Sequence, residues 1–262
     1  MRCKIILVIL VLVLLYNLIK NQKIEKFSNN DWFNDNIDLY YINLDDSKNR
    51  RNSMEKQLSK LNINYNRFSA YNGKLIDKKF SNILINNFNT INYNSHIYKN
   101  KKGSLGNYIS QLTCWYNFYL KSNKKYLMIM EDDIIIKKNF VNKIQKTIKS
   151  VNDDNWSMIK FFCFEKRDGD YYNDYMIKTK TTQQDYKSKK NTGMQCYILN
   201  KKKIKDIIED MLPIENDTFD WKVKYLMLNH KILITNDNFV ETPDHNKFSD
   251  RKKLDGVKKW MV

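Results

Sequence analysis

Proline, glycine and histidine are scarce in this chain. Its 262 residues include two Pro, six Gly and three His. This composition excludes collagen-like and linker-dominated proteins, and we find no internal period of the kind that marks solenoids or propellers. A hydrophobic fraction of 42% is enough to bury a core, so we expect one large folded domain or two small ones.

Cysteine is also sparse, and its four residues show no C-x-x-C pairing: Cys3, Cys114, Cys163 and Cys196. No His stands at zinc-finger spacing from them, which argues against a structural zinc site. Cys3 borders an apolar segment and is either a plain thiol or an acylation site. The other three leave two alternatives open, buried thiols or one disulfide formed in an oxidising lumen.

Acidic residues are outnumbered by basic ones. The chain has 46 Lys and Arg against 29 Asp and Glu, which gives a formal net charge of +17. Such a surface attracts nucleic acid, acidic lipid headgroups or phosphorylated small molecules, because each offers phosphates. The lysines are scattered, and a run of charge is usually a solvated face. Charge alone therefore does not choose among these partners.

A single long apolar run stands at the N-terminus. Arg2 and Lys4 precede residues 5–19, which are almost entirely apolar. No small-residue cleavage site follows, so we predict an uncleaved signal anchor over residues 1–19, with a cleaved secretory signal as the alternative. Lysines on both flanks leave the orientation open. We expect a single-pass membrane protein of type II whose C-terminal domain is lumenal; secretion is the alternative.

Beyond this run, residues 20–36 are polar and are predicted to form an irregular stalk, and residues 37–262 to form the main domain. Short apolar runs predict strands at 39–44, 65–69, 126–130, 157–164, 195–199 and 232–235. Helical spacing is found at 48–61, 105–120, 139–148, 201–211 and 219–228. The alternation predicts an α/β domain with a mostly parallel sheet. The long polar segment 165–190 is interpreted as a lid.

The densest acidic group is Glu131-Asp132-Asp133, at the end of the predicted strand 126–130. In open α/β sheets ligands bind beyond the carboxyl ends of the strands. Neighbouring carboxylates repel one another, so a divalent cation or cationic side chains must neutralise them. Hard oxygen ligands suit Mg²⁺ or Mn²⁺, which complete their shells with substrate phosphates. The alternative interpretation is a solvated acidic turn.

Four segments resemble glycosyltransferase family 25, the lipooligosaccharide and collagen-type galactosyltransferases. Residues 41–50 followed by 67–73 resemble the family's opening, and Gly103-Ser104-Leu105-Gly106 begins a segment similar to its glycine-containing block. The run Met130-Glu131-Asp132-Asp133 resembles its acidic motif, and Thr192-Gly193 before residues 196–199 resembles its later strand. The segments occur in the family's order, and the resemblance covers residues 38–241.

The resemblance implies a GT-A-like nucleotide-diphospho-sugar transferase fold, preceded in this chain by the N-terminal hydrophobic helix. It implies inverting transfer of a hexose, galactose or glucose, from a UDP-sugar to a hydroxyl, assisted by Mn²⁺ or Mg²⁺. The implied acceptor is a glycan, a lipid-linked glycan such as lipooligosaccharide, or hydroxylysine on a collagen-like protein. No nucleic-acid partner is expected, and nothing indicates the oligomeric state.

The resemblance also implies roles for single residues. Those expected around the nucleotide and its diphosphate are Asn43, Leu44, Arg50, Gly103, Gly106 and Asp132. The expected metal ligands are Asp133 and Asp132, with Glu131 and the late His245 as further candidates. Asp220, just before Trp221, is expected to be the base that takes the acceptor's proton, and Asp217 is the alternative. Either aspartate could instead cap the helix that begins near Phe219.

Two positions depart from the family pattern. Asn107 stands where the family often has Cys, and Gln111 stands where it often has His. The change at Gln111 keeps a second hypothesis open beside the active enzyme, namely a catalytically inactive carbohydrate-binding or scaffold protein with the same fold. A third hypothesis, a basic nucleic-acid-binding protein, explains the net charge but neither the apolar segment nor the acidic triplet.

Overall fold

The computed structural model describes residues 11–17, 30–76, 91–182 and 188–243. Within these ranges, no helix is both long enough and apolar enough to cross a membrane. Residues 11–17 are helical. The rest of the predicted anchor, most of the predicted stalk and His245 lie outside the described residues.

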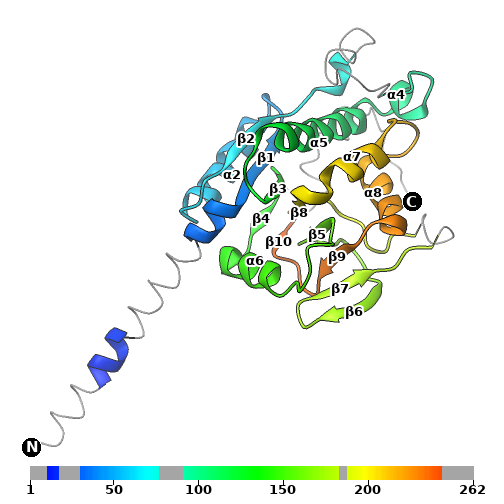
Figure 1. Cartoon of the computed structure of the whole chain (residues 1–262). Coiled ribbons are helices and arrows are strands. Elements are labelled where there is room, and N and C mark those ends of the chain that lie inside the picture. The colour runs from blue at the N-terminus through cyan, green and yellow to red at the C-terminus, as the bar shows by residue number, and fades with distance from the viewer. Residues whose placement is uncertain (1–10, 18–29, 77–90, 183–187, 244–262) are drawn as a thin grey trace, which may run out of the picture.

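A mixed eight-stranded sheet forms the centre of the domain (Figure 1). Its order is β2-β1-β3-β8-β5-β9-β7-β6. The strands are β1 (Ile37–Asn43), β2 (Asn66–Ser69), β3 (Tyr126–Glu131), β5 (Met158–Lys160), β6 (Gly169–Asn173), β7 (Met176–Thr179), β8 (Cys196–Asn200) and β9 (Ile232–Thr235). Strands β2, β1, β3, β5 and β9 run in one direction, whereas β8 and β7 run against them. A separate small sheet pairs β4 (Ile135–Ile136) with β10 (Val240–Glu241).

Helices cover both faces of this sheet, which confirms the α/β class (Figure 1). One face carries α5 (Lys102–Lys121), α7 (Ile204–Met211) and α8 (Phe219–Asn229), with α4 (His96–Asn100) beside α5. The other face carries α2 (Lys48–Ser59) and α6 (Phe140–Lys149). Two 3-10 turns, η1 (Gly73–Leu75) and η3 (Lys201–Lys203), join these elements. Side chains alternate along β3, so that Ile129 packs toward α5 and Met130 toward α2 and α6.

The main domain begins earlier than the sequence predicts. Residues 30–36, assigned above to the irregular stalk, are helical. Phe33 is fully buried in the core on the α2 side, and the Asn30 amide donates a hydrogen bond to the Leu61 carbonyl at 3.2 Å. The apolar pair Trp32-Phe33 within this polar stretch is the signal that the stalk prediction overlooked.

The lid predicted for residues 165–190 is wrong for its described part, which contains a β-hairpin. Strands β6 and β7 pair with each other, and β7 pairs with β9, so the hairpin extends the sheet. The alternation is hard to recognise in the sequence because the outer strand β6 is polar and none of its residues is buried. Residues 183–187 lie outside the described residues.

The described cysteines Cys114, Cys163 and Cys196 are buried free thiols. The alternative of a disulfide among them is therefore wrong. Burial raises the pKa of the Cys114 and Cys196 thiols, so both stay protonated and inert at neutral pH.

Candidate active site

The acidic residues lie at the carboxyl edge of the parallel strands. Strand β1 ends at Asn43 and β3 ends at Glu131. Strand β8 runs in the opposite direction, so the residues that precede it reach the same edge. The Glu131 backbone N–H donates to the Gln195 carbonyl at 2.9 Å. Segments far apart in the sequence therefore meet at this edge, which is where open α/β sheets bind ligands.

Asn43 connects three strands at this edge. Its side chain is almost fully buried, and its Nδ2 donates to Asp132 Oδ2 at 2.5 Å. Its Oδ1 accepts from Arg67 Nε on β2 at 3.0 Å and from Arg51 Nε on α2 at 3.4 Å. A buried amide that uses both its oxygen and its nitrogen in this way fixes the position of the groups around it. Asn43 therefore orients Asp132 from behind the acidic cluster.

Arginines neutralise much of the acidic cluster. Arg50 Nη1 lies 3.4 Å from Asp132 Oδ1 and 3.9 Å from Asp133 Oδ2. Arg67 forms an ion pair with Asp45, and hydrogen bonds from Arg67 and Ser69 lower the pKa of Asp45. Leu44 is half-buried, and its carbonyl accepts from the Ser47 N–H at 2.9 Å, which closes the turn after β1. The structure thus brings Asn43, Arg50, Asp132 and Asp133 together, and their roles in nucleotide and metal binding stay predictions.

Asp133 is the carboxylate best placed to hold a cation. Its Oδ1 is buried and finds no hydrogen-bond partner among the described residues. Asp132 is engaged by Asn43 and Arg50, and Glu131 accepts from the Gln195 amide at 3.1 Å. No group of three or more His, Cys, Asp or Glu in the described ranges is placed to hold a metal ion. The Asp133 oxygen is one carboxylate ligand of the kind that Mg²⁺ or Mn²⁺ takes when substrate phosphates and water complete its shell, and metal binding here stays a prediction.

The predicted glycines lie at the start of α5, beside the acidic edge. A Cβ on Gly106 would come within 2.4 Å of the Tyr71 carbonyl oxygen and 2.7 Å of the Gly73 nitrogen. Only a glycine allows the helix to approach this backbone so closely. Gly103 is buried in the first turn of the same helix. The structure gives Gly106 a packing role, and nucleotide binding at either glycine stays a prediction.

Gln111 belongs to a buried hydrogen-bond network. Trp115 Nε1 donates to the Tyr197 hydroxyl at 2.8 Å, and that hydroxyl donates to Gln111 Oε1 at 2.5 Å. Gln111 Nε2 in turn donates to Asn107 Oδ1 at 3.4 Å. The two departures from the family pattern, at 107 and 111, therefore contact each other. Because Gln111 is fully buried, it acts on the site only by holding the side chains of Tyr197 and Asn107 in place.

Asp220 lies in the first turn of α8, near that network. The N-cap of α8 is Thr218, so the interpretation of either aspartate as the helix cap is wrong. Burial raises the pKa of Tyr197 well above its ordinary value, and the charges of Glu131 and Asp220 act in the same direction. Both carboxylates thus lie near one buried hydroxyl. Asp217 precedes the helix and is half-exposed. The surroundings favour Asp220 as the base, and its role stays a prediction.

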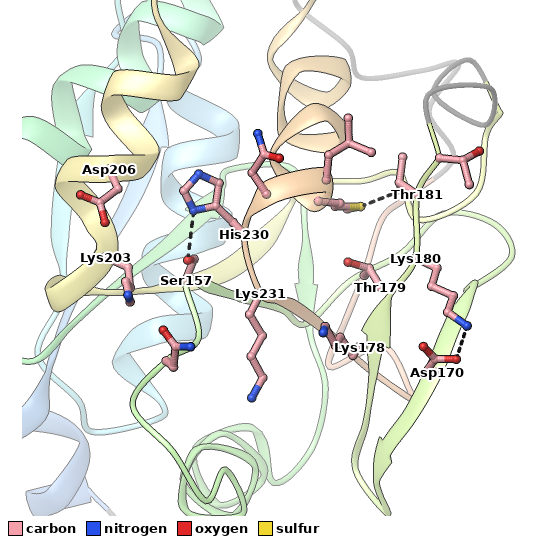
Figure 2. Close-up of a pocket in the computed structure, with 15 residues that line it drawn as sticks. Ser157, Asp170, Lys178, Thr179, Lys180, Thr181, Lys203, Asp206, His230 and Lys231 are labelled. Carbon is pink, nitrogen blue, oxygen red and sulfur yellow. Dashed lines mark hydrogen bonds and ion pairs between the residues drawn. The ribbon is translucent and has the colours of Figure 1, made fainter.

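A cavity of about 740 Å³ lies at the opposite, amino-terminal edge of the sheet (Figure 2). Its lining includes Ser157 before β5, Lys231 before β9 and Lys203 after β8. Figure 2 shows His230 directed toward Ser157, and the Nδ1 to Oγ distance is 3.4 Å. The carboxylates of the acidic triplet do not line this cavity. Its size therefore does not make it the site of transfer.

Sequence reasoning missed several residues that the fold brings to the carboxyl edge. They are Arg51, Arg67, Gln195, Tyr197 and Lys160. Arg67 was part of a recognisable segment but received no role. Gln195 and Tyr197 stand at the start of a strand, whereas the strand-end pattern points only to residues that follow strands.

A family model matches this chain. It describes glycosyltransferase family 25 (LPS biosynthesis protein) and covers residues 36–221. The chain belongs to glycosyltransferase family 25. The match includes the acidic edge and Asp220. The chain is accordingly a glycosyltransferase, with a sugar donor and an acceptor as its substrates.

No curated protein matches the sequence of this family 25 chain. Among solved structures, a glycosyltransferase involved in the glycosylation of the major capsid of PBCV-1 matches 84% of this chain and 97% of its own, with 7% identity and a TM-score of 0.44. The structure of A197 from STIV matches 82% of this chain and 87% of its own, with 10% identity and a TM-score of 0.40.

Proposed function

We propose that this chain is a membrane-anchored, inverting hexosyltransferase of GT-A type. It transfers galactose or glucose from a UDP-sugar to a hydroxyl of a glycan, a lipid-linked glycan such as lipooligosaccharide, or hydroxylysine of a collagen-like protein. The apolar residues 1–19 anchor it as a type II protein, so that the domain faces a lumen. A cleaved signal with secretion of the domain is the alternative.

One observation supports this function above the others, the arrangement of charge at the carboxyl edge. Asp133 offers a buried oxygen without a hydrogen-bond partner among the described residues. Arg50 lies beside it and holds a fixed positive charge where a leaving diphosphate becomes more negative. Asp220 follows Phe219, whose ring packs against Trp115, and Trp115 donates to the Tyr197 hydroxyl at the start of β8. A donor site and a proton acceptor thus stand within one region of the fold.

In the proposed reaction, the acceptor hydroxyl attacks the anomeric carbon of the donor sugar. The bond between that carbon and the UDP oxygen breaks as the new glycosidic bond forms, and the hydroxyl proton passes to the Asp220 carboxylate. Arg50 stabilises the negative charge of the departing UDP. A Mn²⁺ or Mg²⁺ ion, when bound by Asp133 with Asp132 beside it, supplies Lewis-acid stabilisation of the same leaving group.

The test is Mn²⁺-dependent release of UDP from a panel of UDP-hexoses by the full-length protein. We expect Asp133→Asn to lower kcat/KM at least ~100-fold, because the cation loses its main protein ligand. Asp46→Asn is the matched control, since Asp46 is exposed and follows the neighbouring strand end. It should leave the rate within about twofold.

The same assay tests the base. Asp220→Asn should lower kcat by ~10²–10⁴-fold, and Asp217→Asn should leave it nearly unchanged. The reverse result would move the base to Asp217. Absence of turnover with every UDP-hexose would contradict the proposed function and favour an inactive carbohydrate-binding or scaffold role.

A further inference from the structure

The cavity at the amino-terminal edge of the sheet has no role in the proposed transfer. Its volume of about 740 Å³ falls within the range of ~300–1,000 Å³ that is common for small-molecule sites. Segments far apart in the sequence form it, among them the residues before β5, the strand β7, the start of α7 and the end of α8. The fold therefore builds a second concave site, separate from the acidic edge.

Nearly buried polar side chains line part of this cavity. Ser157 is only 3% exposed and Thr179 only 5%. The Ser157 Oγ lies 3.4 Å from Nδ1 of His230, as Figure 2 shows. The other ring nitrogen of His230, Nε2, lies 2.7 Å from Asp210 Oδ2. Because Asp210 holds the ring against Ser157, the cavity presents hydrogen-bonding groups in fixed positions.

The charged side chains of the lining give the cavity a positive surplus. They are Lys178, Lys180, Lys203, Lys231, Asp170 and Asp206. Lys180 pairs with Asp170 at 2.5 Å, and Lys231 pairs with Asp153 at 2.7 Å. Among the described residues, Lys178 and Lys203 have no ion-pair or hydrogen-bond partner for their ammonium groups, and Asp206 has no ion-pair partner. Two cations thus stand against one carboxylate, and an anionic ligand balances the difference.

The two lysines without a partner come from different sides of the cavity. Figure 2 shows Lys203 beside α7 and Lys178 on β7, with Ser157 and His230 between them in this view. Lys203 is half-buried. Its ammonium group is therefore less screened by water and gains more from an anionic partner than a fully solvated lysine does.

The rest of the lining favours a sugar over a nucleotide. Within the described residues, no Phe, Tyr or Trp lines the cavity, so a nucleotide base finds no such ring on which to stack. The hydroxyls, amides and carboxylates of the lining offer both donors and acceptors, which match the hydroxyl groups of a sugar. Met227 and Leu228 add a small apolar surface for the C–H groups of a sugar ring.

We propose that this cavity is a second ligand site, which binds a sugar that carries a negative charge, as a phosphate ester or a carboxylate. Lys203 and Lys178 bind the anionic group, and Ser157 and His230 bind hydroxyl groups of the sugar. Strands of five residues (β8) and six residues (β3) separate the cavity from the acidic edge, which corresponds to roughly 16–20 Å at ~3.3 Å per residue. The proposal does not depend on the proposed function, since it concerns a different edge of the sheet.

Isothermal titration calorimetry of the full-length protein tests the proposal with glucose 6-phosphate, glucuronate, glucose and inorganic phosphate. We expect at least one of the two charged sugars to bind with a Kd of ~1 mM or below, and glucose and inorganic phosphate to bind at least ~10-fold more weakly. The tighter charged sugar shows whether the site prefers phosphate or carboxylate. Equal binding of glucose or of inorganic phosphate overturns the proposal, and so does the absence of binding of both charged sugars up to about 10 mM.

Variants of the lining test the role of charge. Lys203→Met and Lys178→Met should each raise the Kd of the charged sugar ~10-fold or more, because each removes a charged hydrogen-bond donor. Asp206→Asn should lower the Kd severalfold, because it removes a carboxylate that repels the anion. Lys146→Met is the matched control and should leave the Kd unchanged, since Lys146 is an exposed lysine on α6, on the other face of the sheet. Unchanged binding in the folded Lys203→Met and Lys178→Met proteins, or equal weakening by Lys146→Met, overturns the proposal.

Saturating UDP separates this cavity from the donor site. The Kd of the charged sugar should stay within about twofold when UDP is present, because UDP is expected at the acidic edge. Backbone amides of residues 178–181 and 203–206 should exchange with solvent more slowly when the charged sugar is bound, and those of residues 131–133 should not change. Displacement of the sugar by UDP, or protection confined to residues 131–133, overturns the proposal. Absence of UDP release together with retained sugar binding contradicts the proposed function and supports this second site.

Discussion

A single buried lysine at the end of β5 illustrates how charge is distributed in this protein. Lys160 is surrounded by protein, yet it stands in a chain whose other lysines mostly face solvent. Burial lowers its pKa from 10.5 to about 8. A group whose pKa falls on folding makes stability depend on pH, because the unfolded chain binds more protons in the interval between the two values.

This interval gives a prediction for stability. Below pH 8 the folded and unfolded states both carry the proton, so the full cost of burying the charge is present. As pH rises toward 10.5 the folded protein loses the proton first, and the contribution of Lys160 to the free energy of unfolding increases. The gain should total about 3 kcal/mol at most. Urea unfolding of wild type and Lys160→Met at about pH 7 and about pH 10 measures it. An equal difference between the two proteins at both pH values would contradict the expectation.

At the residue scale, the sequence indicates which carboxylates lie at the carboxyl edge of the sheet more clearly than it indicates which lysines do. Asp132 and Asp133 follow the apolar strand after Glu131, and the end of a strand is where ligands bind in such folds. Lys160 also ends an apolar run, but in the sequence it cannot be distinguished from the solvated lysines that often stand at strand ends. Only the packing of α8 and the 188–191 turn over β5 buries it, and these contacts join residues separated by 31 positions or more in the chain.

At the scale of elements, the β6–β7 hairpin depends on the turn that follows it. Asn191 Nδ2 donates to the Asp168 carbonyl and lies 3.5 Å from the Lys180 carbonyl, so one side chain reaches both ends of the hairpin. Lys190 adds an ion pair with Asp168 at 2.9 Å. The base of the hairpin is therefore fixed where it meets the sheet.

Two substitutions of Asn191 separate these bonds from its backbone conformation. Asn191→Gly removes the side-chain hydrogen bonds and permits the positive φ, and it should lower the free energy of unfolding by ~1–3 kcal/mol. Asn191→Ala removes the same bonds and adds the left-handed strain, for about 1 kcal/mol more. Urea denaturation compares them. If the alanine variant is as stable as the glycine variant, the strain is not the reason for asparagine at this position.

The long helices and most strands of the central sheet were predictable, and the β6–β7 hairpin was not. Helices α5 and α8 bury apolar side chains at regular spacing, and their predicted ranges agree with the structure to within a few residues. Strand β6 is polar and β7 has only four residues; β7 becomes a strand because β9 offers a pairing edge, and β6 pairs in turn with β7. A pairing partner of this kind, more than 50 residues away, leaves no local pattern in the sequence.

At the scale of the whole molecule, the positive surplus and the acidic edge are parts of one arrangement. Arg50 and Arg51 on α2 and Arg67 on β2 all converge on the acidic edge. They lower the repulsion among the carboxylates and keep the region attractive to a diphosphate. Composition predicts the surplus of charge. The fold decides that these arginines meet the carboxylates.

The boundary of the main domain can be tested by truncation. A fragment of residues 30–262 keeps Phe33 and the Asn30 bond to Leu61, whereas a fragment of residues 37–262 loses both. Removing a fully buried phenylalanine costs ~3–5 kcal/mol, so the shorter fragment should unfold at a clearly lower urea concentration. Phe33→Ala in the longer fragment should account for most of the loss. Equal midpoints for the two fragments would place residues 30–36 outside the stable domain.

The direction of β8 has a consequence for engineering. This strand enters the sheet at the edge where the carboxylates gather and leaves it at the edge where Lys203 lines the cavity. Insertions in the connection before β8 therefore disturb the acidic edge, and insertions in the connection after β8 affect the opposite edge. For measurements of transfer, the cavity edge is thus the suitable place to attach a fluorophore, a solid support or a fusion partner, since such an addition leaves the acidic edge, the proposed donor site, open.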